Sequence, residues 1–504
     1  MQHRIWMVDV AREQCLTRDH LFRFAQVAQE ANFTGLGLYL EHRFAYPRTP
    51  WVQGKGCLTP ESVRDLQSEF PSLQIIPFVN VLSHVEGFIY TEEGRQFHEQ
   101  LFKGMQACPC DPGFQQLARD IIDDTIDIFR SDLIHIGGDE TWQLAVCPKC
   151  KALGEGQDDP KAHVYTTHYA PLIDQVVKRG RIPGVWGDMM IDHPQIAKIL
   201  PKEAIVFDWQ YFSGLNDSAP KMAELGYKII GCPSIQTYNA AWCHTEKSEE
   251  NVRQVTRDVQ EMGYEGVCLT TWECGVYGAY DTLFPAVKWS GEAIQNPSTP
   301  NTLLESYKEE GMTEWAKLMG KDLEELGGIF EATMIRSSLK SRLLLYGNPF
   351  LLWMHYGEQL AGETGQKAIE LCNRAMASTD DQGAKGVSVF VRSAIEFAQM
   401  AEKAHLHYAK REPEQAVAAL APTRYLFDTL QKVAKATHER IGGSLADIER
   451  AKAAKAHVEK VIQRIRDYGN GELGYLPAFE VITNPKFMPH DQACWWLING
   501  WANE

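Results

Sequence analysis

Eight short apolar runs alternate with amphipathic segments along roughly the first 295 residues of this 504-residue chain. The runs are apolar at successive positions, as strands buried on both faces of a parallel sheet are. The segments between them repeat apolar residues with a helical period, most clearly at 114–129 and 251–262. Eight strand-helix units over nearly 300 residues predict a (β/α)8 TIM barrel, an α/β fold. We expect its strands at 4–8, 35–40, 74–79, 132–136, 182–186, 204–207, 228–231 and 266–270.

The pattern changes after NPSTP at 296–300, which has the composition of a linker. Helical periodicity with few strand signals then dominates, so we expect a barrel over 1–298 and an all-α C-terminal domain over 299–504. The run 489–501 (PHDQACWWLINGW) is too aromatic for a solvated tail. It is expected to pack against the barrel or against a second subunit of a homo-oligomer, and lining the substrate site is the alternative. The long helical segments are predicted at 305–325, 330–345, 387–407, 412–437 and 445–468.

Bulk properties narrow the class of partner. The formal net charge of −16 argues against nucleic acid and against an anionic membrane surface. No apolar run approaches the ~18 residues of a membrane span. The first residues, MQHRIWMVDVAR, are interrupted by Asp9 and Arg12 and do not match a signal peptide. We therefore expect a cytoplasmic protein that acts on small or imported molecules.

The string LIHIGGDETW at 133–142 carries the most specific chemical signal in the sequence. A short apolar run stops at two glycines, and the carboxylates Asp139 and Glu140 follow directly. Neighbouring side chains on a strand point to opposite faces, but beyond a glycine pair the backbone can bring both carboxylates into one site. One ionised and one protonated carboxyl suit cleavage of a glycosidic bond. For a bare Asp-Glu pair, a helix cap is the competing interpretation.

The string His135-Ile136-Gly137-Gly138-Asp139-Glu140 resembles the H-x-G-G-D-E signature of glycoside hydrolase family 20, the β-N-acetylhexosaminidases. The resemblance covers roughly the first 300 residues. It implies an exo-acting, retaining hydrolase in which the substrate's 2-acetamido oxygen is the nucleophile. Asp139 would then orient and polarise the acetamide, and Glu140 would be the general acid and later the base. The implied substrate is a small oligosaccharide or glycoside with a terminal β-linked N-acetylhexosamine, and catalysis would need no cofactor.

Further positions carry over from the resemblance. Arg4-x-x-Met7-Val8-Asp9 is similar to the family's R-x-x-M-L-D, whose arginine binds sugar hydroxyls. Tyr238 resembles the tyrosine that donates to the acetamide oxygen, and His135 the histidine paired with the acid glutamate. The small α/β domain that often precedes the family's barrel is expected to be missing.

Two departures affect the recognition of sugar hydroxyls. His84 matches a family histidine that binds at the site, but Asn80 stands where the family usually has an aspartate. Glu273 directly follows Trp272, whereas the family's glutamate lies two residues past the tryptophan. The choice between glucosamine and galactosamine configuration therefore stays open.

The carboxyl ends of the other predicted strands are rich in sugar-binding side chains. Tryptophan faces stack on pyranose rings, and carboxylates or amides accept and donate to hydroxyls. A single tryptophan at such a position would be core packing, but several near one rim favour a binding site. In the family, Trp186, Trp209 and Trp272 would be the aromatic walls around the N-acetyl group and ring. The candidate substrate-binding residues at these strand ends are Trp186, Asp188, Trp209, Tyr211, Asn239, Trp242, Trp272 and Glu273.

Four of the 12 cysteines form a candidate structural zinc site. They belong to Cys108-Pro109-Cys110 and to Cys147-Pro148-Lys149-Cys150, and four thiolates are a common structural zinc set. The tight C-x-C spacing is unusual for such a site. Unligated thiols or one redox-sensitive pair are the alternatives.

Competing functions remain at this level. Within glycosidases the alternative is a strict β-N-acetylgalactosaminidase with the same mechanism. A non-catalytic amino-sugar-binding barrel would keep the tryptophans but would not need a paired acid. A metal-dependent deacetylase on the same fold would need metal ligands at the strand ends.

Overall fold

The computed structural model describes residues 1–11, 17–53, 57–101, 103–236, 242–272, 279–326, 360, 362–442 and 445–472. Eight parallel strands close into a barrel through the pairing of the first strand with the last, where Ile5 lies opposite Cys268. The strands are β1 (His3–Asp9), β2 (Gly35–Tyr39), β3 (Gln74–Phe78), β6 (Leu133–His135), β7 (Ile182–Trp186), β8 (Ile205–Trp209), β9 (Lys228–Cys232) and β11 (Gly266–Thr271). The predicted barrel is confirmed, and all eight strands lie where the apolar runs are.

The irregular strands lie outside these runs. The short strand β10 (Ser234–Gln236) follows β9 after Pro233 and also pairs with β11. An antiparallel hairpin of β4 (His98–Gln100) and β5 (Lys103–Ala107) separates β3 from β6. This hairpin was not predicted, because its strands are too short to show a period.

Each barrel strand packs on two hydrophobic layers. In β6, Leu133 joins the cluster inside the barrel, whereas the next residue, Ile134, joins the layer between strands and helices. The same alternation puts Met7 inside and Val8 outside in β1. Since successive side chains point to opposite faces, both layers are satisfied only by the continuous apolar runs seen in the sequence.

Capping residues fix where the barrel helices begin. Thr17 accepts from the backbone of His20 before α1, and Thr59 forms a capping box with Ser62 before α2, which has Pro60 at its first position. The longer helices are α1 (Arg18–Glu30), α2 (Pro60–Glu69), α4 (Pro112–Ile128), α6 (Pro160–Lys178), α10 (Thr245–Met262) and α12 (Phe284–Gln295). The short ones are α3 (Glu86–Ile89), α5 (Pro148–Gly154), α7 (Asp188–Asp192), α8 (Pro194–Ile199), α9 (Ala219–Ala223) and α11 (Ala279–Thr282).

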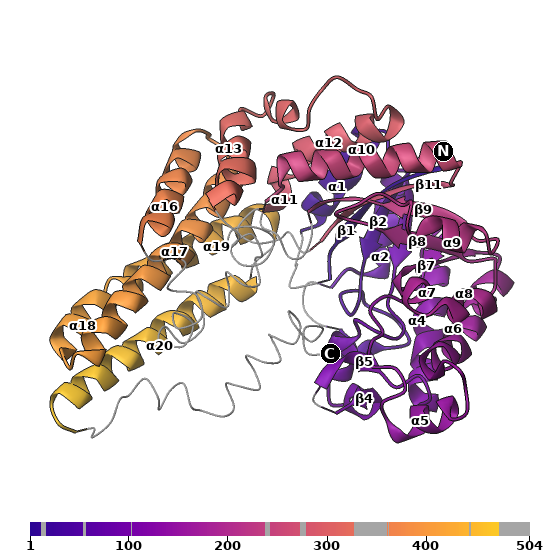
Figure 1. Cartoon of the computed structure of the whole chain (residues 1–504), viewed down its shortest axis with the longest axis horizontal. Helices are drawn as coiled ribbons and strands as arrows, with labels where there is room; N and C mark the ends of the chain where they lie inside the picture. Colours follow the sequence, from indigo (N-terminus) through magenta and orange to yellow (C-terminus); the bar gives the residue numbers. More distant parts are fainter. Residues whose placement is uncertain are drawn as a thin grey trace.

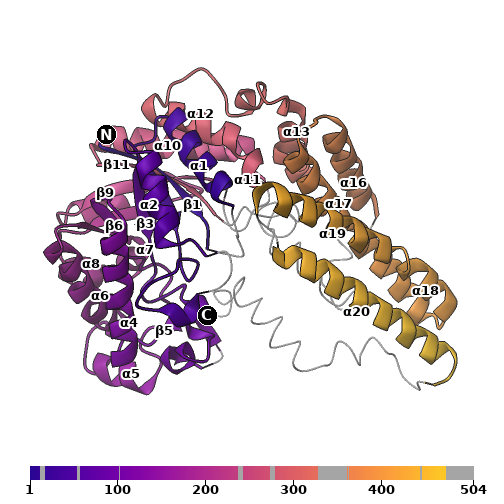
Figure 2. The ribbon, with the colours of Figure 1, turned by 180° about the vertical axis from the view of Figure 1, so that it is seen from behind.

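A helical region follows the barrel, as predicted (Figure 1). Its long helices lie side by side next to the barrel, and both views place α11 and α19 at the junction (Figures 1 and 2). The helices are α13 (Thr313–Lys317), α16 (Gly362–Ala377), α17 (Gln382–Ala409), α18 (Pro413–Leu420), α19 (Thr423–Ile441) and α20 (Leu445–Gly469). None of the described helices is both long and apolar enough for a membrane span. The exact boundary at 298/299 stays a prediction.

Two of the predicted long helices are broken. The segment 305–325 begins with a 3-10 turn (Leu304–Tyr307), which Gly311, with φ +65°, separates from the rest. It then continues as α13, a π turn (Leu318–Asp322) and a second 3-10 turn (Glu324–Leu326). The segment 412–437 divides into α18 and α19 at Pro422, which lacks an N–H. The predicted helix at 330–345 and the aromatic run at 489–501 lie outside the described residues.

Candidate functional site

A glycine turn carries the predicted catalytic pair out of strand β6. Gly137 and Gly138 have φ of +76° and +108°, which L side chains rarely adopt. A Cβ on Gly137 would lie 2.5 Å from Asn80 Oδ1, and one on Gly138 would lie 2.4 Å from the Tyr165 hydroxyl. That hydroxyl donates to the Gly138 carbonyl over 2.9 Å. The turn therefore requires glycine for its dihedral angles and for the close contact with α6.

Beyond the turn, neighbouring elements hold the backbone of Asp139 and Glu140. The Ser83 hydroxyl donates to the Asp139 carbonyl, and the Glu140 N–H donates to Asp188 Oδ2 over 2.8 Å. Glu140 itself has φ +50°, a left-handed conformation that is uncommon for glutamate. Strand alternation is lost here, and both carboxylates reach the same imidazole.

His84, in the loop after β3, lies between the two carboxylates. Its Nε2 is 3.3 Å from Asp139 Oδ2 and 3.1 Å from Glu140 Oε2. Burial alone would lower the pKa of His84, but the carboxylates of Asp139 and Glu140 outweigh burial and raise it well above the ordinary value. The protonated form of His84 is therefore favoured, and its imidazole lies between the two carboxylates.

His135, predicted to pair with the acid glutamate, does not do so. Its ring lies inside the barrel, with its centroid 4.5 Å from Phe78, 4.4 Å from Trp186 and 4.7 Å from Phe207. Its Nδ1 accepts from the Gly137 N–H over 3.1 Å, and burial lowers its pKa well below the ordinary value. The physical reason is strand alternation: His135 shares the inward face of Leu133, below the glycine turn.

Several buried polar atoms around the pair have no partner among the described residues. They are Asp139 Oδ1, Asp188 Oδ1 and Trp186 Nε1. Buried polar groups are normally hydrogen-bonded, to protein, water or a ligand. Burial and the nearby Asp139 raise the pKa of Asp188 well above its ordinary value, against the Glu140 N–H that lowers it. The region therefore offers unused acceptors and a donor to a polar ligand.

Aromatic side chains line the same end of the barrel. Trp186 is buried at the top of the interior cluster, and Trp209 and Trp272 pack against that cluster while remaining partly exposed. The Trp272 indole N–H donates to the Tyr211 hydroxyl over 2.8 Å, and the rings of Trp209 and Tyr211 are 5.3 Å apart. Burial raises the pKa of Tyr211 well above 10, so the hydroxyl stays protonated. Four of the predicted aromatic residues therefore lie together.

Two predicted substrate-binding residues lie elsewhere. Trp242 is 0% exposed and belongs to the large hydrophobic cluster outside the barrel interior, not to the interior cluster that contains Trp186. Arg4 lies at the amino end of β1, where its Nε donates to the Asn32 carbonyl over 2.9 Å. Active sites of TIM barrels lie at the opposite, carboxyl end, so the prediction for Arg4 was wrong. Proximity to a strand in the sequence did not reveal which end or face the side chain occupies.

Three predicted site residues, Tyr238, Asn239 and Glu273, lie outside the described residues, and their roles stay predictions.

Among the described residues, three groups of donor atoms could hold a metal ion, and one of them, Glu41 with His84 and Glu86, shares its histidine with a second group. The donor atoms of His84, Asp139 and Glu140 lie within 4.8 Å of one another, but the imidazole nitrogen is already shared between the carboxylates. The predicted zinc ligands Cys108, Cys110, Cys147 and Cys150 are brought together near β4 and α5.

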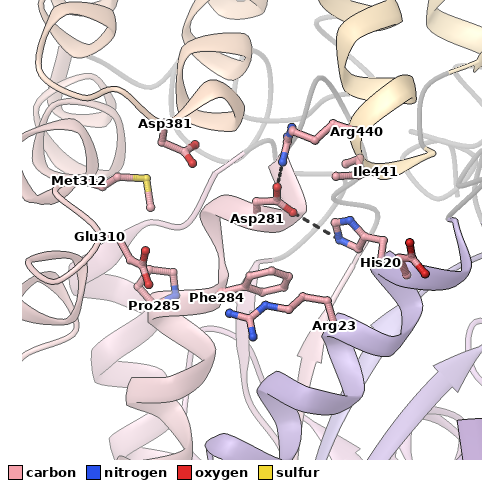
Figure 3. Close-up of a pocket in the computed structure, with 11 residues that line it drawn as sticks. His20, Arg23, Asp281, Phe284, Pro285, Glu310, Met312, Asp381, Arg440 and Ile441 are labelled. Atoms are coloured by element: carbon pink, nitrogen blue, oxygen red, sulfur yellow. Dashed lines mark ion pairs between the residues drawn. The ribbon is translucent and has the colours of Figure 1, made fainter.

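A cavity of about 380 Å³ lies between the barrel and the helical region (Figure 3). Asp281 contacts Arg440 there, and its other oxygen is 3.4 Å from His20 Nε2. Burial, with Arg440 and Arg23 adding to it, lowers the pKa of His20 to about 3, so the imidazole stays neutral. Because these groups contact one another across the junction, we regard the cavity as part of the joint between the two regions.

Comparison with known proteins finds a family match within the barrel. Residues 78–273 match the Glycosyl hydrolase family 20, catalytic domain. None of the curated proteins compared matches the chain.

Solved structures match at low identity and therefore support the fold alone. The β-N-acetylhexosaminidase from Bacteroides fragilis is 16% identical over 61% of this chain and 69% of its own, with a TM-score of 0.50. A GH20 exo-β-N-acetylglucosaminidase from Vibrio harveyi, in complex with N-acetylglucosamine, is 17% identical over 61% of this chain, with a TM-score of 0.50. The match spans only 56% of the Vibrio chain. A chitobiase from Flavobacterium johnsoniae is 15% identical over 92% of this chain and 72% of its own, with a TM-score of 0.51.

Proposed function

We propose that the protein is an exo-acting, retaining β-N-acetylhexosaminidase, because residues 78–273 match the catalytic domain of glycosyl hydrolase family 20. The observation that carries the proposal is the contact of His84 with both Asp139 and Glu140, at 3.3 and 3.1 Å. A barrel that only binds amino sugars has no use for an imidazole held between two carboxylates. An enzyme that protonates a leaving oxygen has a direct use for it.

The proposed roles follow from the contacts of each group. Glu140 is the general acid, and His84 returns a proton to it across the 3.1 Å contact. Asp139 uses Oδ2 to contact His84 and keeps Oδ1 for the acetamide N–H of the substrate. The acetamide oxygen then attacks the anomeric carbon, and water that Glu140 deprotonates opens the cyclised intermediate. Tyr238 would donate to that oxygen.

Sugar binding is proposed at the aromatic side chains. Trp209 and Trp272 present partly exposed rings, and the bond from Trp272 to Tyr211 fixes their positions. The ordered indole faces suit the apolar face of a pyranose ring. The N-acetylglucosamine in the Vibrio harveyi structure supports an amino-sugar substrate for this chain as well.

The test is a panel of aryl β-glycosides of GlcNAc, GalNAc, glucose and galactose, assayed with the wild type and with Glu140→Gln. We expect turnover only of the two N-acetyl sugars, because the others lack the internal nucleophile. Glu140→Gln should lose about 100-fold or more on aryl groups that need protonation and much less on activated ones. Turnover of the GalNAc glycoside alone would identify the enzyme as a strict β-N-acetylgalactosaminidase.

Three outcomes would contradict the proposal. Cleavage of the aryl β-glucoside at a similar rate would exclude the acetamide as nucleophile. Complete inactivity of the wild type on all N-acetyl sugars, with binding retained, would indicate a binding protein. Loss of activity with a chelator, restored by a divalent cation, would favour metal-dependent deacetylation.

A further inference from the structure

Four cysteine sulfurs from two distant loops converge beside the loop that follows the catalytic pair. Cys108 Sγ lies 3.5 Å from both Cys147 Sγ and Cys150 Sγ, and Cys110 Sγ lies 3.3 Å from Cys150 Sγ. A disulfide requires about 2.05 Å, and all four are free thiols. Tetrahedral zinc with Zn–S bonds of about 2.3 Å separates its sulfurs by roughly 3.8 Å. These three sulfur–sulfur distances are close to those of a four-thiolate zinc site, and Cys110 lies at the edge of the tightest donor group, which is Glu99, Cys108, Cys147 and Cys150.

The surrounding backbone holds two of these thiols in position. Cys147 is the N-cap of α5, and its Sγ accepts from the Cys150 N–H over 3.4 Å. The carboxylate of Glu99, on β4, accepts from the N–H groups of Val146 and Cys147, each over 2.8 Å. The turn is therefore built before any ion arrives.

Burial separates this cluster from ordinary surface thiols. Cys108 and Cys150 are 4% and 0% exposed, whereas Cys110 and Cys147 are partly exposed. The buried pair faces the protein interior and the other pair reaches solvent, so an ion can enter the cluster from the solvent side. Figure 1 shows β4, β5 and α5 gathered at this end of the barrel.

We propose that Cys108, Cys110, Cys147 and Cys150 bind one structural Zn²⁺ as four thiolates, with the release of the thiol protons. The ion cross-links the loop before α4 to the loop that leaves Glu140. Glu99 is the neighbouring group that orients the Cys147 turn. Its Oε2 lies 3.2 Å from Cys150 Sγ, and it forms an alternative donor set with Cys108, Cys147 and Cys150. Zinc's preference for sulfur in structural sites selects Cys110 instead.

The experiment measures zinc in the full-length protein, produced with zinc in the medium and purified without a metal-affinity step. We expect about one zinc per chain by elemental analysis, lost in Cys110→Ser and in Cys147→Ser. The matched control Cys57→Ser, outside the cluster, should keep it. Replacing zinc by Co²⁺ should give the sulfur charge-transfer absorption and d–d bands of a four-thiolate site.

A measurement on the wild type covers the case in which the variants do not fold. A chelator should release the zinc and make four further thiols reactive toward a thiol reagent. The proposal is overturned by zinc-free protein, by a disulfide among the four cysteines found under non-reducing conditions, or by thiol reactivity that zinc does not change. Zinc kept in Cys110→Ser but lost in Glu99→Gln would overturn the four-thiolate set. Because these readouts do not use activity, they are independent of the proposed hydrolase function.

Discussion

At the scale of single residues, the proposed proton transfer depends on which histidine contacts Glu140, the proposed acid. His135 belongs to the motif, yet it stacks on Phe78 at 4.5 Å inside the barrel and has a lowered pKa. His84, about fifty positions earlier, contacts both carboxylates and has a raised pKa. An imidazole that keeps its proton near neutral pH can resupply Glu140, whereas a buried neutral one cannot.

Replacing His84 tests this role. We choose His84→Asn because φ at this position is +51°, which asparagine tolerates well. We expect kcat/KM to fall by about 100-fold or more, the usual range for loss of a proton-transfer group. In the wild type, His84 loses its proton only as the pH rises through its raised pKa. Without the imidazole, carboxyl groups lose their proton at lower pH, so the alkaline limb of the pH profile should move toward acid.

A matched control is His193→Asn, which removes an imidazole that contacts Asp159 at 2.9 Å, outside the site. Its activity and pH profile should match those of the wild type. If His84→Asn kept the alkaline limb of the wild-type pH profile, the proton of His84 would not take part in turnover.

At the scale of elements, the turn between β6 and the catalytic pair sets the geometry of the site. It is fixed from three directions: by the Tyr165 hydroxyl from α6, by Ser83 from the loop after β3, and by Asp188 at the start of α7. Each of these contacts is to the backbone, so none of them uses the carboxylates of Asp139 and Glu140. The barrel thus supplies a rigid frame, and the turn supplies the departure from strand geometry.

Gly138→Ala tests the turn. The new Cβ would lie 2.4 Å from the Tyr165 hydroxyl at φ +108°, so the turn must shift. A displacement of about 1 Å at a catalytic group can cost on the order of 100-fold in rate, and the strained backbone costs about 1–3 kcal/mol in stability. Kinetics and urea unfolding give the two values.

Gly156→Ala is the control for backbone strain alone. Gly156 has φ +76° but no atom within 4 Å of its Cβ position. It should cost about 1 kcal/mol and leave the rate unchanged. Equal kinetic effects of the two substitutions would show that the contact with Tyr165 does not position the pair.

At the scale of the whole molecule, charged side chains connect the helical region to the barrel. Asp281, on α11, contacts Arg440 from α19 and lies 3.4 Å from His20 of α1 (Figure 3). Burial lowers the pKa of Arg440. Within the helical region, the Trp315 indole donates to the Ala384 carbonyl over 3.1 Å.

Asp281→Ala should weaken the attachment of α19 to α11. It leaves the half-buried cation of Arg440 without its carboxylate partner, which we expect to cost on the order of 2 kcal/mol, less than a fully buried pair because Arg440 is 34% exposed. Hydrogen exchange should increase in α19 and α11 while the strands stay protected.

Glu314→Ala removes an exposed carboxylate that lies 3.4 Å from Arg374, and it should cost less than about 1 kcal/mol. If Asp281→Ala were no more destabilising than this control, the joint would rest on apolar packing alone.

Local patterns in the sequence determined the architecture. Continuous apolar runs are needed where a strand packs on two layers, so all eight strands could be predicted. Thr17 and Thr59 marked helix starts because their side chains satisfy backbone donors a few residues away. The glycine pair and the two carboxylates could also be identified, since their chemistry needs adjacent positions.

Only the tertiary structure decided which side chains meet at the site. The motif suggested His135 for the acid, but its place on the inward face of β6 removes it, and a loop from β3 supplies His84 instead. Arg4 and Trp242 have suitable chemistry but occupy the wrong end and the wrong layer of the barrel. The sequence determined the strands and the chemistry of their ends, because those depend on near neighbours. Closure of the barrel decided which end, face and loop each group occupies, because residues far apart in the chain must meet there.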